Sequence, residues 1–194
     1  MQPELVSLLE VQSGHFQFES GHHGNLWLDL HALLLRPHRL QPYLNELAAR
    51  LARYKIQGVC GPLIGGAFVA QAIATILDLE FSFAERVETM GCGVHYRIPD
   101  RFRAALGGKR VAIVDDAINA GSAVCGTLTG LQLCGANPVV IGALFVLGSA
   151  AVRLSAEHDI PVESMAQLPG SLWTPSKCPL CAAHVPLKNA ANEA

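Results

Sequence analysis

The sequence predicts an α/β protein built on a doubly wound parallel sheet. Short apolar runs that can form buried strands are followed by glycine-containing loops and then by segments with helical periodicity. This order occurs twice in the middle of the chain, at residues 56–77 and 110–135. Alternating strands and helices are typical of a parallel sheet, whose ligands bind at the carboxyl ends of the strands.

A small N-terminal hood is expected to precede this core, over residues 1–54. Residues 3–12 and 39–53 have the spacing of helices. Between them, HFQFES (15–20) and NLWLDL (25–30) alternate as short strands joined by the turn-rich GHHG.

The core is expected over residues 55–168, followed by a tail over residues 169–194, so that residues 1–194 form a single domain. The expected strands are IQGVC (56–60), LEFSFAE (79–85), RVAIV (110–114) and PVVIGALFVL (138–147). The expected helices are AFVAQAIATIL (67–77) and VCGTLTGLQLCG (124–135). A polar, glycine-containing excursion runs from 86 to 108 and is expected to be a loop.

Bulk properties exclude several classes of protein. A net charge of −2 with 51% hydrophobic residues is typical neither of a disordered chain nor of a basic nucleic-acid binder. The first residues lack the features of a secretory signal, and the longest nearly apolar run, 139–152, is too short to span a membrane. We therefore expect a soluble cytoplasmic protein with no nucleic-acid or membrane partner. Cys60, Cys92, Cys125 and Cys134 lack the spacing of a disulfide framework, so reduced thiols are expected.

Two adjacent acids, Asp115 and Asp116, end the apolar strand RVAIV and precede a loop of small residues. A loop that leads into a helix N-terminus suits a phosphate, whereas two carboxylates suit a pair of neighbouring hydroxyls or a Mg²⁺ ion. The stretch therefore favours a ribose 5-phosphate. The alternative is that the acids only end a strand and cap the next segment of the chain.

The loop GPLIGG (61–66) supplies a second place for an anion, and its position beside the first loop favours a pyrophosphate. It lacks the Lys-Ser/Thr of a P-loop, and no G-x-G-x-x-G opens a helix, so ATPase and dinucleotide folds are not indicated.

These segments resemble a known family. VAIVDDAINAGSA (111–123) is similar to the phosphoribosyl pyrophosphate signature of the type I phosphoribosyltransferases, and the whole chain is similar to the orotate phosphoribosyltransferases. GHFQFESGHHGNLWLDL (14–30) resembles the hood of that family, GPLIGGAFVA its pyrophosphate loop, and LWTPSKCPLCAAHVPL (172–187) the tail of some bacterial members.

The resemblance implies a pentosyltransferase that transfers ribose 5-phosphate from phosphoribosyl pyrophosphate to orotate and releases pyrophosphate, in pyrimidine nucleotide biosynthesis. It implies Mg²⁺ as cofactor and a homodimer in which a mobile loop, here residues 86–108, reaches the partner's site. It implies Asp116 and Arg86 as catalytic residues and Trp27, Leu28 and Asn119 as base-binding residues. The implied sugar-phosphate and pyrophosphate residues are Gly65, Gly66, Asp115, Asp116, Ala117, Ile118, Asn119, Ala120, Gly121, Ser122 and Ala123.

The excursion departs from the family pattern because it carries no Lys between residues 87 and 108. Arg86 remains as a pyrophosphate ligand, and His95 or Arg97 are candidates to replace the missing Lys. Six of the fourteen Lys and Arg lie from Arg86 to Arg110, which favours a basic lid; a solvated charged loop is the alternative.

Two further departures concern the base. Glu19 stands where the family has a Lys, and Gly148 and Ser149 stand where it has the Arg that pairs with the carboxylate of orotate. Arg153 is a candidate to compensate. The alternatives are a transferase for another base and a non-catalytic sensor that binds phosphoribosyl pyrophosphate.

The tail contains a C-x-x-C-x-x-H pattern, in which Cys178, Cys181 and His184 are candidate zinc ligands. The alternative is a reduced C-x-x-C without metal. The other single histidines, at 15, 22, 23, 31, 38 and 158, are expected as surface or hood residues, with His22 and His23 beside the base pocket.

Overall fold

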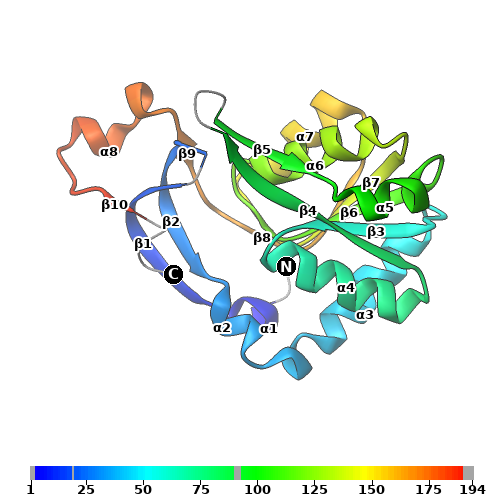
Figure 1. Cartoon of the computed structure of the whole chain (residues 1–194). Coiled ribbons are helices and arrows are strands. Elements are labelled where there is room, and N and C mark those ends of the chain that lie inside the picture. Colours follow the sequence, from blue (N-terminus) through cyan, green and yellow to red (C-terminus); the bar gives the residue numbers. More distant parts are fainter. Residues whose placement is uncertain (1–2, 19, 90–92, 190–194) are drawn as a thin grey trace.

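A central sheet of six strands forms the body of the protein in the computed structural model, which describes residues 3–18, 20–89 and 93–189. The strand order is β5-β4-β3-β6-β7-β8, and every neighbouring pair is parallel except β4 and β5 (Figure 1). The strands are β3 (Gly58–Pro62), β4 (Glu80–Thr89), β5 (Gly93–Arg97), β6 (Arg110–Ile118), β7 (Asn137–Leu147) and β8 (Val162–Leu168). The predicted α/β class is confirmed.

Helices cover both faces of this sheet (Figure 1). One apolar cluster joins α3 and α4 to the sheet, and a second cluster joins α5, α6 and α7 to it. The helices are α3 (Gln41–Ala52), α4 (Gly65–Leu77), α5 (Asp100–Leu106), α6 (Ser122–Leu133) and α7 (Ala150–His158). The sheet is therefore doubly wound, as predicted, although α7 and β8 had no counterpart among the predicted elements.

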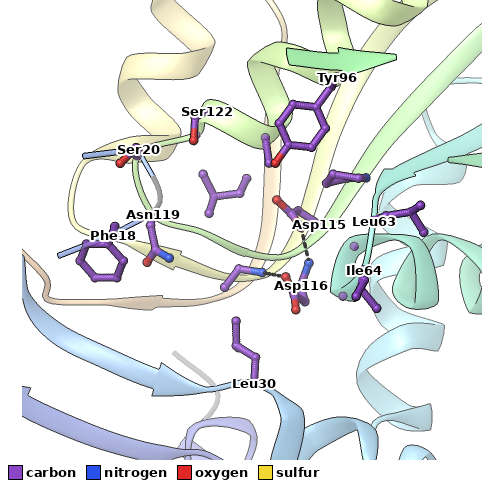
Figure 2. A pocket seen from close by; sticks show the side chains of 18 residues that line it. Phe18, Ser20, Leu30, Leu63, Ile64, Tyr96, Asp115, Asp116, Asn119 and Ser122 are labelled. Atoms are coloured by element: carbon purple, nitrogen blue, oxygen red, sulfur yellow. Dashed lines mark hydrogen bonds between the residues drawn. The ribbon is translucent and has the colours of Figure 1, made fainter. Parts of the chain in front are cut away.

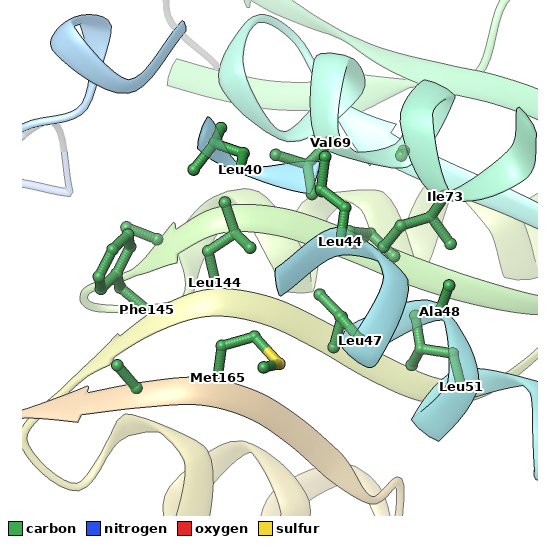
Figure 3. Packing of buried hydrophobic residues seen from close by; sticks show 14 of the residues in the cluster. Leu40, Leu44, Leu47, Ala48, Leu51, Val69, Ile73, Leu144, Phe145 and Met165 are labelled. Carbon is green, nitrogen blue, oxygen red and sulfur yellow. The ribbon is translucent and has the colours of Figure 1, made fainter. Parts of the chain in front are cut away.

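The apolar stripe of α3 packs on β7 and β8 (Figure 3). Leu44, Leu47 and Leu51 recur every three or four residues and lie in one buried cluster with Leu144 of β7 and Met165 of β8. The predicted helix over 39–53 is confirmed, but the helix covers the central sheet rather than the hood to which the sequence analysis assigned it.

A second, smaller sheet forms the hood, in the order β10-β1-β2-β9. Its centre is the antiparallel hairpin of β1 (Glu10–Gln17) and β2 (His23–Asp29). Two strands of the tail cover its edges, because β10 (Lys188–Asn189) pairs with β1 and β9 (Leu172–Trp173) pairs with β2. The tail therefore belongs to the hood, a pairing that was not among the predicted features.

The predicted helix over residues 3–12 is wrong. α1 spans only Pro3–Val6, and the chain is extended from Glu10, where it pairs with Asp29 of β2. Pairing with a distant strand overrides the local helical spacing. The short helix α2 (His31–Leu34) and the turn η1 (Pro37–Arg39) link β2 to α3, while η2 (Pro175–Lys177) and α8 (Pro179–Ala182) lie between β9 and β10.

In the residues that the structure describes, 86–89 and 93–108, the excursion is not a loop. It continues β4 to Thr89, returns as β5 and ends in α5. β5 packs closely on α6, because a Cβ atom on Gly126 would overlap the ring of Tyr96 and one on Gly130 would lie 3.3 Å from the Tyr96 carbonyl oxygen. The hairpin thus packs against its own chain.

Among the described helices, none combines the length and the apolar character needed to cross a lipid bilayer.

Candidate active site

The acid pair lies at the carboxyl end of β6, in the middle of the central sheet (Figure 2). Residues 111–114 are buried, because β3 and β7 flank the strand and helices cover both faces. Pairing with β7 continues as far as Ile118, so Asp115 and Asp116 belong to the strand and only residues 119–121 separate it from α6. The predicted loop over 115–123 is therefore shorter than expected.

Backbone N–H groups orient both carboxylates. The N–H of Asp116 donates to Oδ1 of Asp115 at 3.0 Å, and the N–H of Ala117 donates to Oδ1 of Asp116 at 2.8 Å. Burial raises the pKa of both carboxyls, and the neighbouring charge of Asp116 raises the pKa of Asp115 further. Hydroxyl donors or a cation placed between the two carboxylates would offset the free-energy cost of ionising them in this buried position.

The N-terminus of α4 lies directly against the acids. A Cβ atom on Gly65 would overlap Oδ2 of Asp116, and a Cβ atom on Gly66 would lie 2.6 Å from Oδ1 of Asp115. Only glycine allows the backbone to come this close to the carboxylates. The second loop and the acid pair therefore form one site, with the positive end of a 13-residue helix facing it.

The N-terminus of α6 faces the same space. Gly121 has a φ of +80°, a left-handed conformation that favours glycine, and a Cβ atom there would lie 3.1 Å from Leu154. The N–H groups in the first turn of α6 have no partner within the helix. They are therefore available to an anion, and Ser122 adds a hydroxyl on the cavity side (Figure 2).

Two adjoining cavities occupy this region, one of about 230 Å³ over the acid pair and one of about 190 Å³ under the hood. Gly65, Asp116 and Asn119 line both cavities. In the described part of the chain, Oδ1 of Asn119 is a buried acceptor without a hydrogen-bond partner. Buried acceptors are nearly always paired, so this atom points to a ligand that supplies a donor.

The structure brings the predicted sugar-phosphate residues together. All of them line the first cavity, namely Gly65, Gly66, Asp115, Asp116, Ala117, Ile118, Asn119, Ala120, Gly121, Ser122 and Ala123. Trp27 and Leu28 line the second cavity with Asn119. The Trp27 ring stacks on the Phe16 ring, with 6.5 Å between the ring centroids.

Other lining residues were missed by the sequence analysis. Tyr96 reaches the first cavity from β5, Phe18 from the hood hairpin and Ile64 from the loop before α4 (Figure 2), while His31 lines the second cavity from α2. His31 directly follows the predicted strand NLWLDL, which was a usable signal. No local pattern marks Tyr96 or Phe18, because the fold alone brings them here.

The candidate cations of the hairpin do not line either cavity. Arg86 pairs in register with Tyr96 and therefore shares its face of the hairpin, whereas His95 and Arg97 flank Tyr96 in β5 and face the other side. Arg86 contacts Glu88 at 3.4 Å, and Arg97 contacts Glu85 at 3.0 Å. Of the three residues, Arg86 is the one that shares the face of Tyr96.

The candidate residues around the base are spread more widely. Glu19 lies outside the described residues. Gly148, Ser149 and Arg153 line a third cavity of about 530 Å³, to which His22 also contributes. Arg153 donates to the carbonyl oxygen of Ala120 at 2.5 Å, so it contacts the loop before α6 rather than the second cavity.

Two expectations about the histidines are wrong. His184 is exposed and does not join the cysteines, and His23 lines neither base-side cavity. The His/Cys group found among the described residues consists of His15, His23, Cys178 and Cys181. The fold selects His15 and His23, which lie far from the cysteines in sequence.

Comparison with known proteins places this site in a family, although no family model matches the chain. The chain is 30% identical over 192 residues to an orotate phosphoribosyltransferase of Pelotomaculum thermopropionicum, covering 94% of this chain and 93% of the relative. It is 26% identical over 185 residues to an orotate phosphoribosyltransferase of Caldanaerobacter subterraneus subsp. tengcongensis, covering 95% and 92%.

Solved structures show the same fold. An adenine phosphoribosyltransferase from Thermoanaerobacter pseudethanolicus matches with a TM-score of 0.70 at 18% identity, over 87% of this chain and 100% of the other. An orotate phosphoribosyltransferase from Aeropyrum pernix matches with a TM-score of 0.63 at 22% identity, over 81% and 88%. The acid pair and the two helix N-termini agree with the sequence similarity, which extends along almost the whole chain. The protein therefore belongs to the orotate phosphoribosyltransferase family.

Proposed function

We propose that this protein transfers ribose 5-phosphate from phosphoribosyl pyrophosphate to orotate and releases pyrophosphate, a reaction of pyrimidine nucleotide biosynthesis. The observation that carries the proposal is the position of Asp116, which lines both the cavity over the acid pair and the cavity under the hood. A sugar held by Asp116 has one cavity for its phosphates and another for the incoming base.

Each part of the donor has a matching group. The ribose hydroxyls donate to Asp115 and Asp116, the 5-phosphate accepts from the N–H groups at the start of α6, and the pyrophosphate lies against the start of α4. Asn119 Oδ1 accepts a hydrogen bond at the boundary of the two cavities. In the reaction, a ring nitrogen of the base forms the new bond to the sugar C1 as the bond to pyrophosphate breaks.

Charge develops on both sides of the breaking bond, positive on the sugar and negative on the leaving group. The carboxylate of Asp116 stabilises the positive sugar, and Arg86 is the proposed cation for the leaving group because it shares the face of Tyr96. The ring of Tyr96 lines the first cavity, where a bound donor would displace water and so strengthen both interactions.

The residues present fit a Mg²⁺ ion. The buried carboxyl of Asp115 and the partly exposed carboxyl of Asp116 offer the hard oxygen ligands that Mg²⁺ prefers, and these two residues would hold the ion directly or through water. A Mg²⁺ ion held there with the donor would supply positive charge to the pyrophosphate.

The second cavity suits a flat pyrimidine. Trp27 and Leu28 supply apolar walls, and His31 is the side chain there that can carry a positive charge towards the carboxylate of orotate. Arg153, in the neighbouring third cavity, contacts the loop before α6 and fixes its position.

We also propose a homodimer and a cytoplasmic location. Leu63, Ile64 and Phe68 are 39%, 65% and 52% exposed beside the site, and a partner subunit would cover such an apolar patch. The free thiols of the described cysteines suit a reducing compartment. Light scattering on the purified protein tests the dimer.

The deciding experiment measures pyrophosphate release from phosphoribosyl pyrophosphate and Mg²⁺ with orotate, beside a panel of other purine and pyrimidine bases. Pyrophosphate release with orotate and with no other base of the panel supports the proposal. Release only with another base changes the acceptor and keeps the transferase. No release with any base, together with a rise in melting temperature on adding the donor, replaces the proposal with the sensor.

A further inference from the structure

Two histidines of the hood and two cysteines of the tail gather outside the proposed active site. We call them the thiol–imidazole cluster, which consists of His15, His23, Cys178 and Cys181. One ligand atom from each residue can be chosen so that all four atoms lie within 4.8 Å of one another. His15, His23 and Cys178 are buried, and Cys181 closes the group on the solvent side.

Four of the six distances within the cluster lie inside or within about 0.2 Å of the range of edges of a metal-centred tetrahedron. Nε2 of His15 lies 3.1 Å from Nδ1 of His23 and 3.4 Å from Sγ of Cys178. Sγ of Cys181 lies 3.7 Å from Nε2 of His15 and 3.2 Å from Nδ1 of His23. A tetrahedron with ordinary Zn–S and Zn–N bond lengths has edges of about 3.3 to 3.8 Å.

The fold holds these groups in place independently of any ion. The pairing of β1 with β2 is irregular between Ser13 and Phe16, so His15 lies at a bulge of β1, and its ring meets that of His23 with the ring centroids 5.0 Å apart. Cys178 directly precedes α8 and Cys181 lies within it, in the C-x-x-C spacing that directs two thiols to one point. The strands β9 and β10 on either side of α8 pair with the same hairpin.

A further contact supports metal ligation. Nδ1 of His15 lies 2.8 Å from the carbonyl oxygen of Val185, which leaves Nε2 directed at the cluster. An imidazole that binds a metal through one nitrogen usually donates the other N–H to a carbonyl or carboxylate, which fixes its tautomer and orientation. His15 therefore has the second partner expected of a metal ligand.

We infer that the thiol–imidazole cluster binds a zinc ion that fastens the C-terminal segment to the hood. Two thiolates and two neutral imidazoles form the donor set that favours tetrahedral Zn²⁺ over Mg²⁺ or Ca²⁺. Four protein ligands leave no position for water or substrate, so the site is structural rather than catalytic.

Zinc content tests this inference without relying on activity. The full chain, isolated under reducing conditions without chelator, is expected to hold one zinc ion per protomer by elemental analysis. Replacement by Co²⁺ is expected to give the visible ligand-field bands of a tetrahedral thiolate–imidazole site. Cys181→Ser changes the exposed ligand, so the fold is expected to persist while zinc is lost and the cobalt bands change.

Matched variants separate these ligands from other residues of the same type. His184→Asn and Cys134→Ser alter a histidine and a cysteine outside the cluster, and both are expected to retain zinc. Removing zinc with a chelator is expected to lower the melting temperature of wild type and to leave that of Cys181→Ser unchanged.

Three results would overturn the inference, and two of them need no variant. The first is wild-type protein that takes up neither added Zn²⁺ nor Co²⁺. The second is a Cys178–Cys181 disulfide in protein isolated under reducing conditions. The third is a Cys181→Ser variant with wild-type zinc content and an unchanged cobalt spectrum.

Discussion

Replacing Gly65 by alanine tests whether the start of α4 and the acid pair form one site. The added Cβ would overlap Oδ2 of Asp116, so either the backbone or the carboxylate must move by more than about 1 Å to reach an ordinary contact. A displacement of that size in a positioning group costs about 10²-fold in rate, or about 2.7 kcal/mol of transition-state stabilisation. We expect kcat/KM for phosphoribosyl pyrophosphate to fall by about this factor.

The assay is steady-state pyrophosphate release, with the donor-induced rise in melting temperature as a measure of binding. Gly58→Ala is the matched control, because it lies in the strand before the same loop and its Cβ would meet its nearest neighbour at 3.5 Å, an ordinary contact. It is expected to retain wild-type kinetics. A folded Gly65→Ala protein with unchanged kcat/KM and unchanged donor binding would refute the assignment of Asp116 to the reacting sugar.

The same geometry supports three further predictions. Burial, and then the charge of Asp116, raise the pKa of Asp115, so the stability that the free protein gains from a protonated Asp115 is lost as pH rises through the folded-state pKa. Asp115→Asn should therefore raise the melting temperature at neutral pH, and this gain should vanish in acid. A pH series of thermal melts measures both effects. Asn119→Ala removes a buried acceptor that has no hydrogen-bond partner among the described residues, so the free protein should be as stable as wild type or more stable, while the donor should bind more weakly. Calorimetric titration beside thermal melts checks both, and tight binding by the variant would contradict the role of Asn119. Arg86→Ala should lower kcat by about 10²-fold while His95→Ala changes it little, because only Arg86 shares the face of Tyr96; equal losses in the two variants would count against this choice of cation.

The half of the candidate site that we propose to hold the phosphates could be predicted because it is local in sequence. Its residues come from two short segments, each a strand, a loop and the first turn of a helix, and the order of apolar, acidic and small residues marks both. The exact end of β6 could not be predicted, because pairing with β7 carries the strand through Asp115 and Asp116 to Ile118. Polar residues at a strand end signal a loop only when no neighbouring strand continues beside them.

The base-side half depends on contacts between distant segments. The cavity under the hood is lined by Phe18 and His31 of the N-terminal segment together with Gly65 and Asn119, and no spacing in the sequence links these segments. The tail strands have two residues each, too few for a periodic pattern, and β9 pairs with a strand about 150 residues earlier (His23 with Trp173). His184 fitted the C-x-x-C-x-x-H pattern by spacing, whereas the fold places His15 and His23 beside the two thiols.

The base cavity depends on both ends of the chain for a physical reason. Trp27 and Leu28 lie in β2, at whose other end His23 pairs with Trp173 of the tail and joins the thiol–imidazole cluster. A two-stranded hairpin is marginally stable alone, and this one has its edges covered by β9 and β10. A structural zinc at this point stabilises every folded state in which the tail is attached, with no contact to substrate. The position of the proposed base-binding side chains therefore depends on residues 172–189 as well as on the hairpin, because β9 and β10 complete the sheet that carries those side chains.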